Sequence, residues 1–210
     1  MLRSMPNSEE AIGPASAMLI EMLHRAGVRA GFGPCPAADL QTVARDLPLS
    51  AELRNLYGTS GPLDTINIPA PLGGITLAPA RDLVSYQSCY RWHGNDGHRL
   101  NEWPDEWVVI ANHSGDPFIA DTAVPGTRVG IAIHGTGSWK PFWIAPTPAD
   151  FLVLLACLTQ AFVVEHLNRP GEDEDDDESW PPTYHDRLAA LLSDHAPGVD
   201  ATAFLNYLCQ

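Results

Sequence analysis

The sequence has few basic residues. Only 12 of its 210 residues are Lys or Arg, against 26 that are Asp or Glu, which gives a formal net charge of −14. Direct binding to nucleic acid depends on Lys and Arg contacts to phosphate, so this class of partner is not expected. The acidic balance favours a basic protein partner, whose encounter it would accelerate. Solubility alone would also explain the charge.

Paired cysteines and long apolar runs are lacking as well. The cysteines are scattered singly, so their spacing predicts neither a zinc site nor a redox couple; they are Cys35, Cys89, Cys157 and Cys209. The N-terminus carries Glu9 and Glu10 and no apolar core, which is unlike a secretory signal. The most apolar window, 151–164, falls short of the ~20 residues that a membrane-spanning helix needs. We therefore expect a cytoplasmic protein with reduced thiols and no membrane contact.

The usual signatures of catalysis are also missing. The sequence has neither G-x-S-x-G nor H-E-x-x-H. The segments Gly31-Phe32-Gly33 and Gly135-Thr136-Gly137 lack the remainder of a dinucleotide fingerprint or a P-loop. We therefore predict a protein that is not an enzyme, with no catalytic residue and no cofactor.

The densest cluster of titratable groups is His93, Asp96 and His98. Two imidazoles and a carboxylate at this spacing are compatible with a metal site. The intervening Gly94 and Gly97, however, favour a flexible, solvated turn over fixed ligands. The sequence therefore predicts no metal, and a metal-dependent hydrolase at this loop stays an outside alternative.

Residues 103–162 carry the strongest structural pattern. Runs rich in aromatic and β-branched residues alternate with turn formers, which predicts an antiparallel meander. Thr147, Pro148 and Asp150 then mark the start of a long apolar helix. The predicted strands are Trp107–Ala111, Pro117–Asp121, Arg128–His134 and, as a possible fourth, Phe142–Ile144.

Helical patterns flank this meander on both sides. The predicted helices are an apolar stripe from Ile12 to Leu23 ending at Gly27, Ala37–Leu47, a helix capped by Ser50 and terminated by Gly58, a short one within Pro79–Tyr90, Tyr184–Leu192 and Ala201–Cys209. Two weak strands are expected at Ile66–Ile68 and Ile75–Leu77. The sequence thus predicts an α+β fold with N-terminal helices, a twisted antiparallel sheet of about four to six strands, a long helix after the sheet and a C-terminal helical extension. The predicted domain spans 1–167, followed by an acidic linker at 168–182 and the extension at 183–210.

The order of several short motifs resembles the SUKH superfamily, over roughly residues 37–162. The motifs are Asp39-Leu40, Leu47-Pro48, Leu53, Leu56-Tyr57-Gly58, Trp107-Val108-Val109-Ile110-Ala111, Gly115-Asp116, Asp121, Val129, Trp139 and Phe151-Leu152. One turn departs from the family pattern, because Gly58 is followed by Thr-Ser-Gly where the family often has a Gly-Gly pair.

The resemblance implies an α+β domain that binds proteins. The superfamily contains a yeast cell-wall-synthesis regulator and many bacterial immunity proteins, which cover or distort the toxic site of a nuclease or other effector. We therefore expect a non-catalytic protein-binding module, an immunity protein that neutralises a basic toxin domain by stoichiometric occlusion. A regulatory or scaffold protein of the same fold, with no toxin partner, is the alternative. The sequence leaves the oligomeric state open.

Two segments are candidates for the contact with a partner. The polar segment 91–106 contains two tryptophans that either anchor it to the core or contact the partner, and acidic residues that would form a rim around them. Its candidate residues are Trp92, Asp96, Glu102, Trp103, Asp105 and Glu106. By contrast, Trp107, Trp139 and Trp143 are expected to lie in the core.

The second candidate segment is the unbroken acidic run Glu172–Glu178. It is either a hydrated, self-repelling linker or a mimic of phosphate charge that engages a cationic cleft. Its candidate contact residues are Asp173, Asp175, Asp176 and Asp177.

Overall fold

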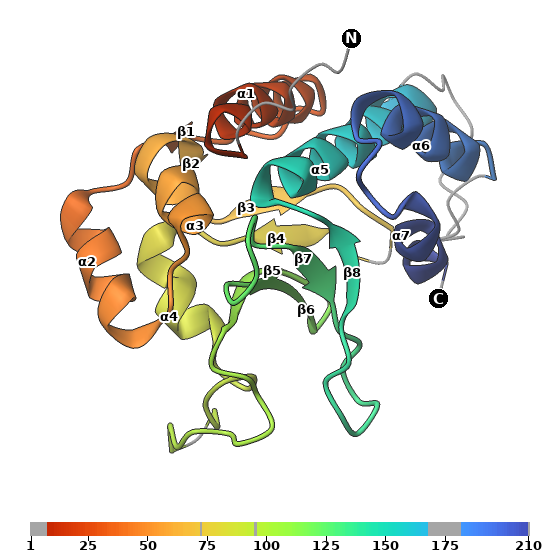
Figure 1. The fold of residues 1–210 in the computed structure, drawn as a ribbon. Coiled ribbons are helices and arrows are strands. Elements are labelled where there is room, and N and C mark those ends of the chain that lie inside the picture. Colours follow the sequence, from red (N-terminus) through yellow and green to blue (C-terminus); the bar gives the residue numbers. More distant parts are fainter. Residues whose placement is uncertain (1–7, 72, 95, 168–181, 210) are drawn as a thin grey trace, which may run out of the picture.

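The computed structural model describes residues 8–71, 73–94, 96–167 and 182–209, and within them the protein has the α+β fold that the sequence predicts (Figure 1). The helical elements are α1 (Ser8–Arg25), α2 (Ala37–Asp46), α3 (Ala51–Asn55), the π-helical turn η1 (Leu56–Ser60), the 3₁₀ turn η2 (Ala80–Asp82), α4 (Leu83–Tyr86), α5 (Pro148–Phe162), the π-helical turn η3 (Val163–Leu167), α6 (Pro182–His195) and α7 (Ala201–Leu208). The strands are β1 (Phe32–Gly33), β2 (Gly61–Pro62), β3 (Ile66–Ile68), β4 (Ile75–Leu77), β5 (Trp107–His113), β6 (Asp116–Asp121), β7 (Val129–Ile131) and β8 (Phe142–Ala145).

The main sheet of the described chain is an antiparallel meander in the order β3-β4-β5-β6-β7-β8, so every strand pairs with its neighbours in sequence. The β5–β6 hairpin is its longest pairing. It is closed by Ser114 and Gly115, both with positive φ, which suits the turn formers at this point of the sequence. Strands β1 and β2 form a separate short pair.

The two faces of the sheet are buried in different ways. Val108, Ile110 and Phe118 belong to the main core beneath α5, whereas Val109 and Ile119 belong to a smaller cluster on the other face. A register shift between Val109 and Ala111 makes Ile110 the extra residue of a bulge in β5. Because both faces of β5 are covered, the strand lacks the polar alternation of a half-exposed one.

Helices α1 and α5 lie side by side over the first face of the sheet (Figure 1). The buried stripe of α1 includes Ile12, Leu19 and Leu23, as predicted. Helix α5 begins at the predicted cap, where the Thr147 hydroxyl accepts a hydrogen bond from the Asp150 N–H at 3.1 Å. An 18-residue stretch, Pro148–Glu165, has a mean hydropathy of 1.6 and is long enough to cross a membrane, but 61% of it is buried inside the fold, as in a core helix.

The C-terminal helices pack onto this body. Tyr184 and Leu188 of α6 are fully buried, and α6 lies against α5. The Asp200 N–H donates to the Ile144 carbonyl of β8 at 2.8 Å, which attaches the start of α7 to the last strand of the sheet. The segment predicted as an acidic linker, 168–182, lies outside the described residues except at Pro182, where α6 begins.

Several predicted boundaries differ from the observed ones. Strand β7 ends at Ile131, not at His134, because the chain leaves β6 there and enters a long turn. The helix capped by Ser50 does not stop at Gly58, since it continues as the π-helical turn through Ser60. Strand β5 extends two residues beyond the predicted Ala111.

Candidate protein-interaction surface

Two loops extend from the second face of the sheet, opposite α5 (Figure 1). We call residues 91–106 the acidic loop and residues 133–141 the glycine loop. Contacts between aromatic rings join them, since the Trp103 and Trp139 ring centroids lie 5.6 Å apart and those of Tyr90 and Trp139 lie 5.3 Å apart. The two loops therefore form one surface.

A row of aromatic side chains lies under this surface, which we call the aromatic row: Tyr90, Trp103, Trp107, Trp139 and Trp143. Each ring meets the next at a tilted or edge-on angle, with Trp103 and Trp107 at 5.6 Å and Trp107 and Trp143 at 6.1 Å between centroids. Such geometries are favoured by the ring quadrupoles. The Arg128 guanidinium covers the far end of the row, 3.9 Å from the centre of the Trp143 ring.

The structure decides between the two roles that the sequence left open for Trp103 and differs from the expectation for three other tryptophans. Trp103 is 1% exposed and lies at the centre of the row, so of its two predicted roles it takes that of a core anchor for the loop. Trp107, Trp139 and Trp143, which were predicted to lie in the core, are only partly buried. The reason is that no long helix of the described chain covers this face, which leaves the outer rings of the row in reach of solvent.

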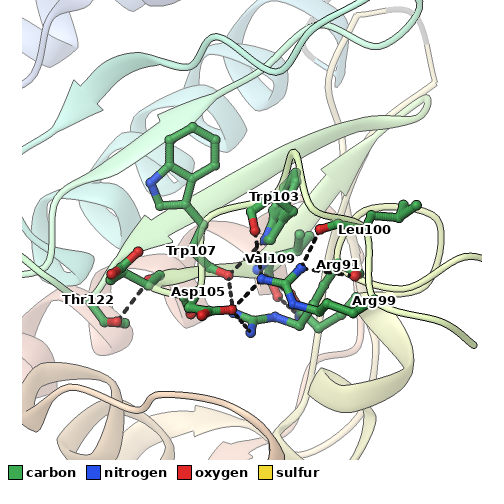
Figure 2. Close-up of polar contacts among 10 residues, drawn as sticks. Arg91, Arg99, Leu100, Trp103, Asp105, Trp107, Val109 and Thr122 are labelled. Carbon is green, nitrogen blue, oxygen red and sulfur yellow. Dashed lines mark hydrogen bonds and ion pairs between the residues drawn. The ribbon is translucent and has the colours of Figure 1, made fainter.

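Two arginines hold the acidic loop together, and Arg91 also binds it to β5 of the sheet (Figure 2). The Arg91 side chain is buried, and its Nη2 donates to the carbonyls of Asp105 at 2.6 Å and Trp107 at 2.8 Å. Arg99 donates to the carbonyls of Leu100 and Trp103 and to the Asp105 carboxylate. Figure 2 shows both guanidinium groups next to Asp105, with the Trp107 indole directed away from them.

Electrostatic effects in this network have identifiable causes. Burial lowers the pKa of Arg91, and the nearby charge of Arg99 lowers it further. The hydrogen bond from Arg99 lowers the pKa of Asp105, so its carboxylate, 83% exposed to solvent, is ionised. The network therefore holds the loop backbone in place while a negative group remains at its surface.

The side chain of buried Gln87 binds the backbone of β5, the strand that follows the acidic loop. Its amide donates to the Val109 carbonyl at 2.9 Å and accepts from the Val109 N–H at 3.0 Å. Strand β4 pairs with β5 only at residues 111–113, so Gln87 binds the backbone groups of β5 just beyond the end of this neighbour.

A groove of about 500 Å³ opens between the two loops. Glu102 of the acidic loop lines one side, and Trp139 with Ile133 and the exposed turn Gly135–Ser138 lines the other. Gly135 and Gly137 have φ values of +74° and +78°, which explains the two glycines in this turn. The groove thus offers a carboxylate and an indole to whatever enters it.

The predicted contact residues are only partly brought together. Asp105 lies at the surface of the network, Glu102 is exposed outside it, and Glu106 is exposed while its carbonyl accepts from Thr122. Trp92 packs against the main core instead of joining the aromatic row. The predicted residues of the acidic run, Asp173, Asp175, Asp176 and Asp177, lie outside the described residues.

The two loops together carry a formal net charge of −1. The two loops contain four acidic residues, Asp96, Glu102, Asp105 and Glu106, and three basic ones, Arg91, Arg99 and Lys140. Since Arg91 is buried and Arg99 binds Asp105, the exposed charges that remain are mainly acidic, with Lys140 as the exception.

Sequence reasoning missed the glycine loop and the outward-facing rings. A signal was available for the rings, because Trp107 precedes buried Val108 and Trp143 precedes buried Ile144. Side chains alternate between the faces of a strand, so each tryptophan lies on the face opposite the α5 core.

No family model matches the chain, and no curated protein matches it.

Proposed function

We propose that this protein is a non-catalytic protein-binding module of the SUKH type, an immunity protein that neutralises a basic toxin domain by stoichiometric occlusion. The proposal is supported by the order of motifs over residues 37–162 and by the surface between the two loops. The observation that carries it is the groove, which is lined by Glu102 of the acidic loop and Trp139 of the glycine loop.

The chemistry of the groove selects a particular kind of anchor. A Lys or Arg side chain of the partner would place its charge beside Glu102 and its apolar stem or guanidinium plane against Trp139. The aromatic row beneath supplies the rigid, amphipathic surface that is typical of binding hot spots. The acidic groups around it, such as Glu106, would speed the approach of a basic partner.

The mechanism that we propose makes and breaks no covalent bond. The arginine network fixes the acidic loop before binding, so little conformational entropy is lost when the partner docks.

The interior cysteine Cys157 fits a packing role. Burial raises the pKa of its thiol to about 12, which keeps the thiol protonated and therefore unreactive as a nucleophile.

The test starts with the purified protein as bait in extracts of the native organism, followed by reconstitution with the captured partner. We expect a 1:1 complex with a basic protein that is weakened by salt. Expression of that partner alone should arrest growth, and co-expression of this protein should restore it. A complex without any toxicity of the partner would support the scaffold alternative instead.

The surface is tested with the double variant Glu102→Gln, Glu106→Gln, which removes two exposed charges outside the arginine network. A control variant with the same charge change, Glu10→Gln, Asp194→Asn, alters exposed residues of α1 and α6 on the other side of the sheet. We expect slower association for the loop variant only. Equal slowing in both variants would show that net charge acts without a specific site.

A further inference from the structure

The tip of the acidic loop brings together three groups that bind metal ions. Ring nitrogens of His93 and His98 and a carboxylate oxygen of Asp96 all lie within 4.8 Å of one another. Both Nδ1 atoms approach the same Asp96 oxygen, at 3.0 Å from His93 and 2.6 Å from His98. The two imidazole rings are stacked, with centroids 4.8 Å apart.

The backbone of the loop fixes this arrangement. The His93 N–H donates to the His98 carbonyl, and the Gly97 N–H donates to the His93 carbonyl, both at 2.9 Å. Gly97 has a φ of +70°, which a glycine adopts without strain. A β-carbon at Gly94 would lie 2.8 Å from the Cys89 sulfur, so the chain is closely packed there. These contacts bring the three side chains together within the exposed turn that the sequence predicts.

The two nitrogen–oxygen distances are close to those of a zinc site, and all three ligand atoms lie within 4.8 Å of one another. Zinc binds imidazole nitrogen and carboxylate oxygen at about 2.0–2.2 Å in a tetrahedron, which places neighbouring ligand atoms roughly 3.3 Å apart. The observed nitrogen–oxygen separations need only a small opening of the side chains to admit the ion. The side chains of His93, Asp96 and His98 are 44%, 61% and 59% exposed, so an ion can reach them from solvent.

A hydrogen-bonded turn without a metal would explain the same geometry, with both imidazoles donating to Asp96. The hydrogen bonds from the His98 backbone N–H and side chain lower the pKa of Asp96, so the carboxylate is ionised at neutral pH. The two explanations differ in whether the Nδ1 atoms of His93 and His98 carry protons. The turn needs a proton on each of these nitrogens, whereas a metal needs both nitrogens unprotonated.

We propose that His93, Asp96 and His98 form a three-ligand site for a zinc-type divalent ion at the tip of the acidic loop. A water molecule completes the tetrahedron, since the site is open to solvent. The ion ties residue 93 to residue 98 and stiffens the loop that carries Glu102. The proposal concerns the ion alone and stands apart from the proposed protein partner, because metal binding is measured without any partner.

The test uses the full chain without a histidine tag, stripped with a chelator and titrated calorimetrically with zinc. We expect one ion per chain, and Co²⁺ in its place should give the absorption bands of a tetrahedral site. His93→Ala and His98→Ala should each lower the affinity about tenfold or more. The matched control is His134→Ala, another histidine that is 59% exposed and contacts a carboxylate, that of Asp116 at 2.7 Å, and its affinity should equal that of the wild type.

A further variant, Asp96→Asn, separates the two explanations. The amide oxygen still accepts hydrogen bonds from the imidazoles, but a neutral amide is a much weaker ligand for zinc than a carboxylate. We expect this variant to keep its circular dichroism and to lose most of its zinc affinity. The proposal is overturned if the wild type takes up no stoichiometric zinc, or if zinc binding survives unchanged in the double variant His93→Ala, His98→Ala.

Discussion

At the scale of single residues, the protein relies on a few buried polar side chains that bind backbone carbonyls in and beside the sheet. Gln87, Arg91 and His113 are all buried, and each binds a backbone carbonyl of a strand or of the loop beside it. An unpaired buried backbone group costs about 1–3 kcal/mol, so these side chains matter more than surface ion pairs do.

Gln87→Leu should destabilise the protein. The substitution keeps the volume but leaves the Val109 N–H and carbonyl without their amide partner, at a cost of about 2–4 kcal/mol. Urea unfolding followed by circular dichroism measures the change. Gln41→Leu, at an exposed position of α2, should stay within about 0.5 kcal/mol of the wild type. Equal losses in both variants would remove the special role of Gln87.

His113 should make stability depend on pH. Its Nε2 lies 2.7 Å from the Pro71 carbonyl and its Nδ1 lies 2.7 Å from the Tyr207 hydroxyl, which also contacts Asp116. Burial lowers the pKa of His113 from its ordinary value of 6.5, although the hydrogen bond to Pro71 and the charge of Asp116 oppose the shift.

The unfolded chain therefore binds more protons than the folded one once the pH falls below about 6.5, so stability falls in this direction. The measurement is the free energy of unfolding from pH 7.5 to 5.5. We expect a smaller decrease in His113→Gln than in the wild type. Parallel curves for the two proteins would show that other groups cause the pH dependence.

At the scale of elements, the β7–β8 pairing is held close by a glycine. A β-carbon at Gly130 would lie 2.7 Å from the Phe142 carbonyl oxygen and 2.7 Å from the Trp143 ring. Gly130→Ala must therefore move β8 and the end of the aromatic row, and we expect a loss of about 1–3 kcal/mol.

The matched control for this prediction is Gly58→Ala. The added carbon would meet only the end of Leu40 at 3.6 Å, an ordinary contact, and the residue lies in a helical turn. Its stability should be unchanged or rise by about 0.5–1 kcal/mol. Thermal unfolding of both variants checks the pair, and equal stabilities would contradict the proposed close approach.

Elements were predicted well where local chemistry determines them. Ser50 and Thr147 each begin a helix as expected, because their hydroxyls accept from the N–H three residues later.

The surface was harder to predict, because Trp103 and Trp107 differ in burial only through the way the acidic loop folds back on the sheet. That fold depends on hydrogen bonds from Arg91 and Arg99 to backbone carbonyls, which leave no pattern in the sequence.

At the scale of the whole molecule, the C-terminal helices supply part of the core. Tyr184, Leu188, Leu192 and Phe204 are at most 1% exposed, and the Tyr207 hydroxyl joins α7 to the β5–β6 hairpin. Burial of four such side chains contributes roughly 6–12 kcal/mol, which is comparable to the whole stability of a domain.

A chain ending at residue 181 should therefore lose cooperative unfolding. We expect a heat-capacity scan without a sharp transition and increased exposure of the apolar α5 surface to a hydrophobic dye. A shortened chain that melts within about 5 °C of the full-length protein would show that residues 1–181 are stable alone.

The claim that a partner binds between the two loops is tested most directly by calorimetric titration of the captured and purified partner. The variant to compare with the wild type is Glu102→Gln, Trp139→Ala, whose folded state is checked first by circular dichroism. We predict a Kd about 30-fold or more above that of the wild type, as expected when a hot spot is lost. An unchanged Kd in this variant would contradict the account and move the interface elsewhere.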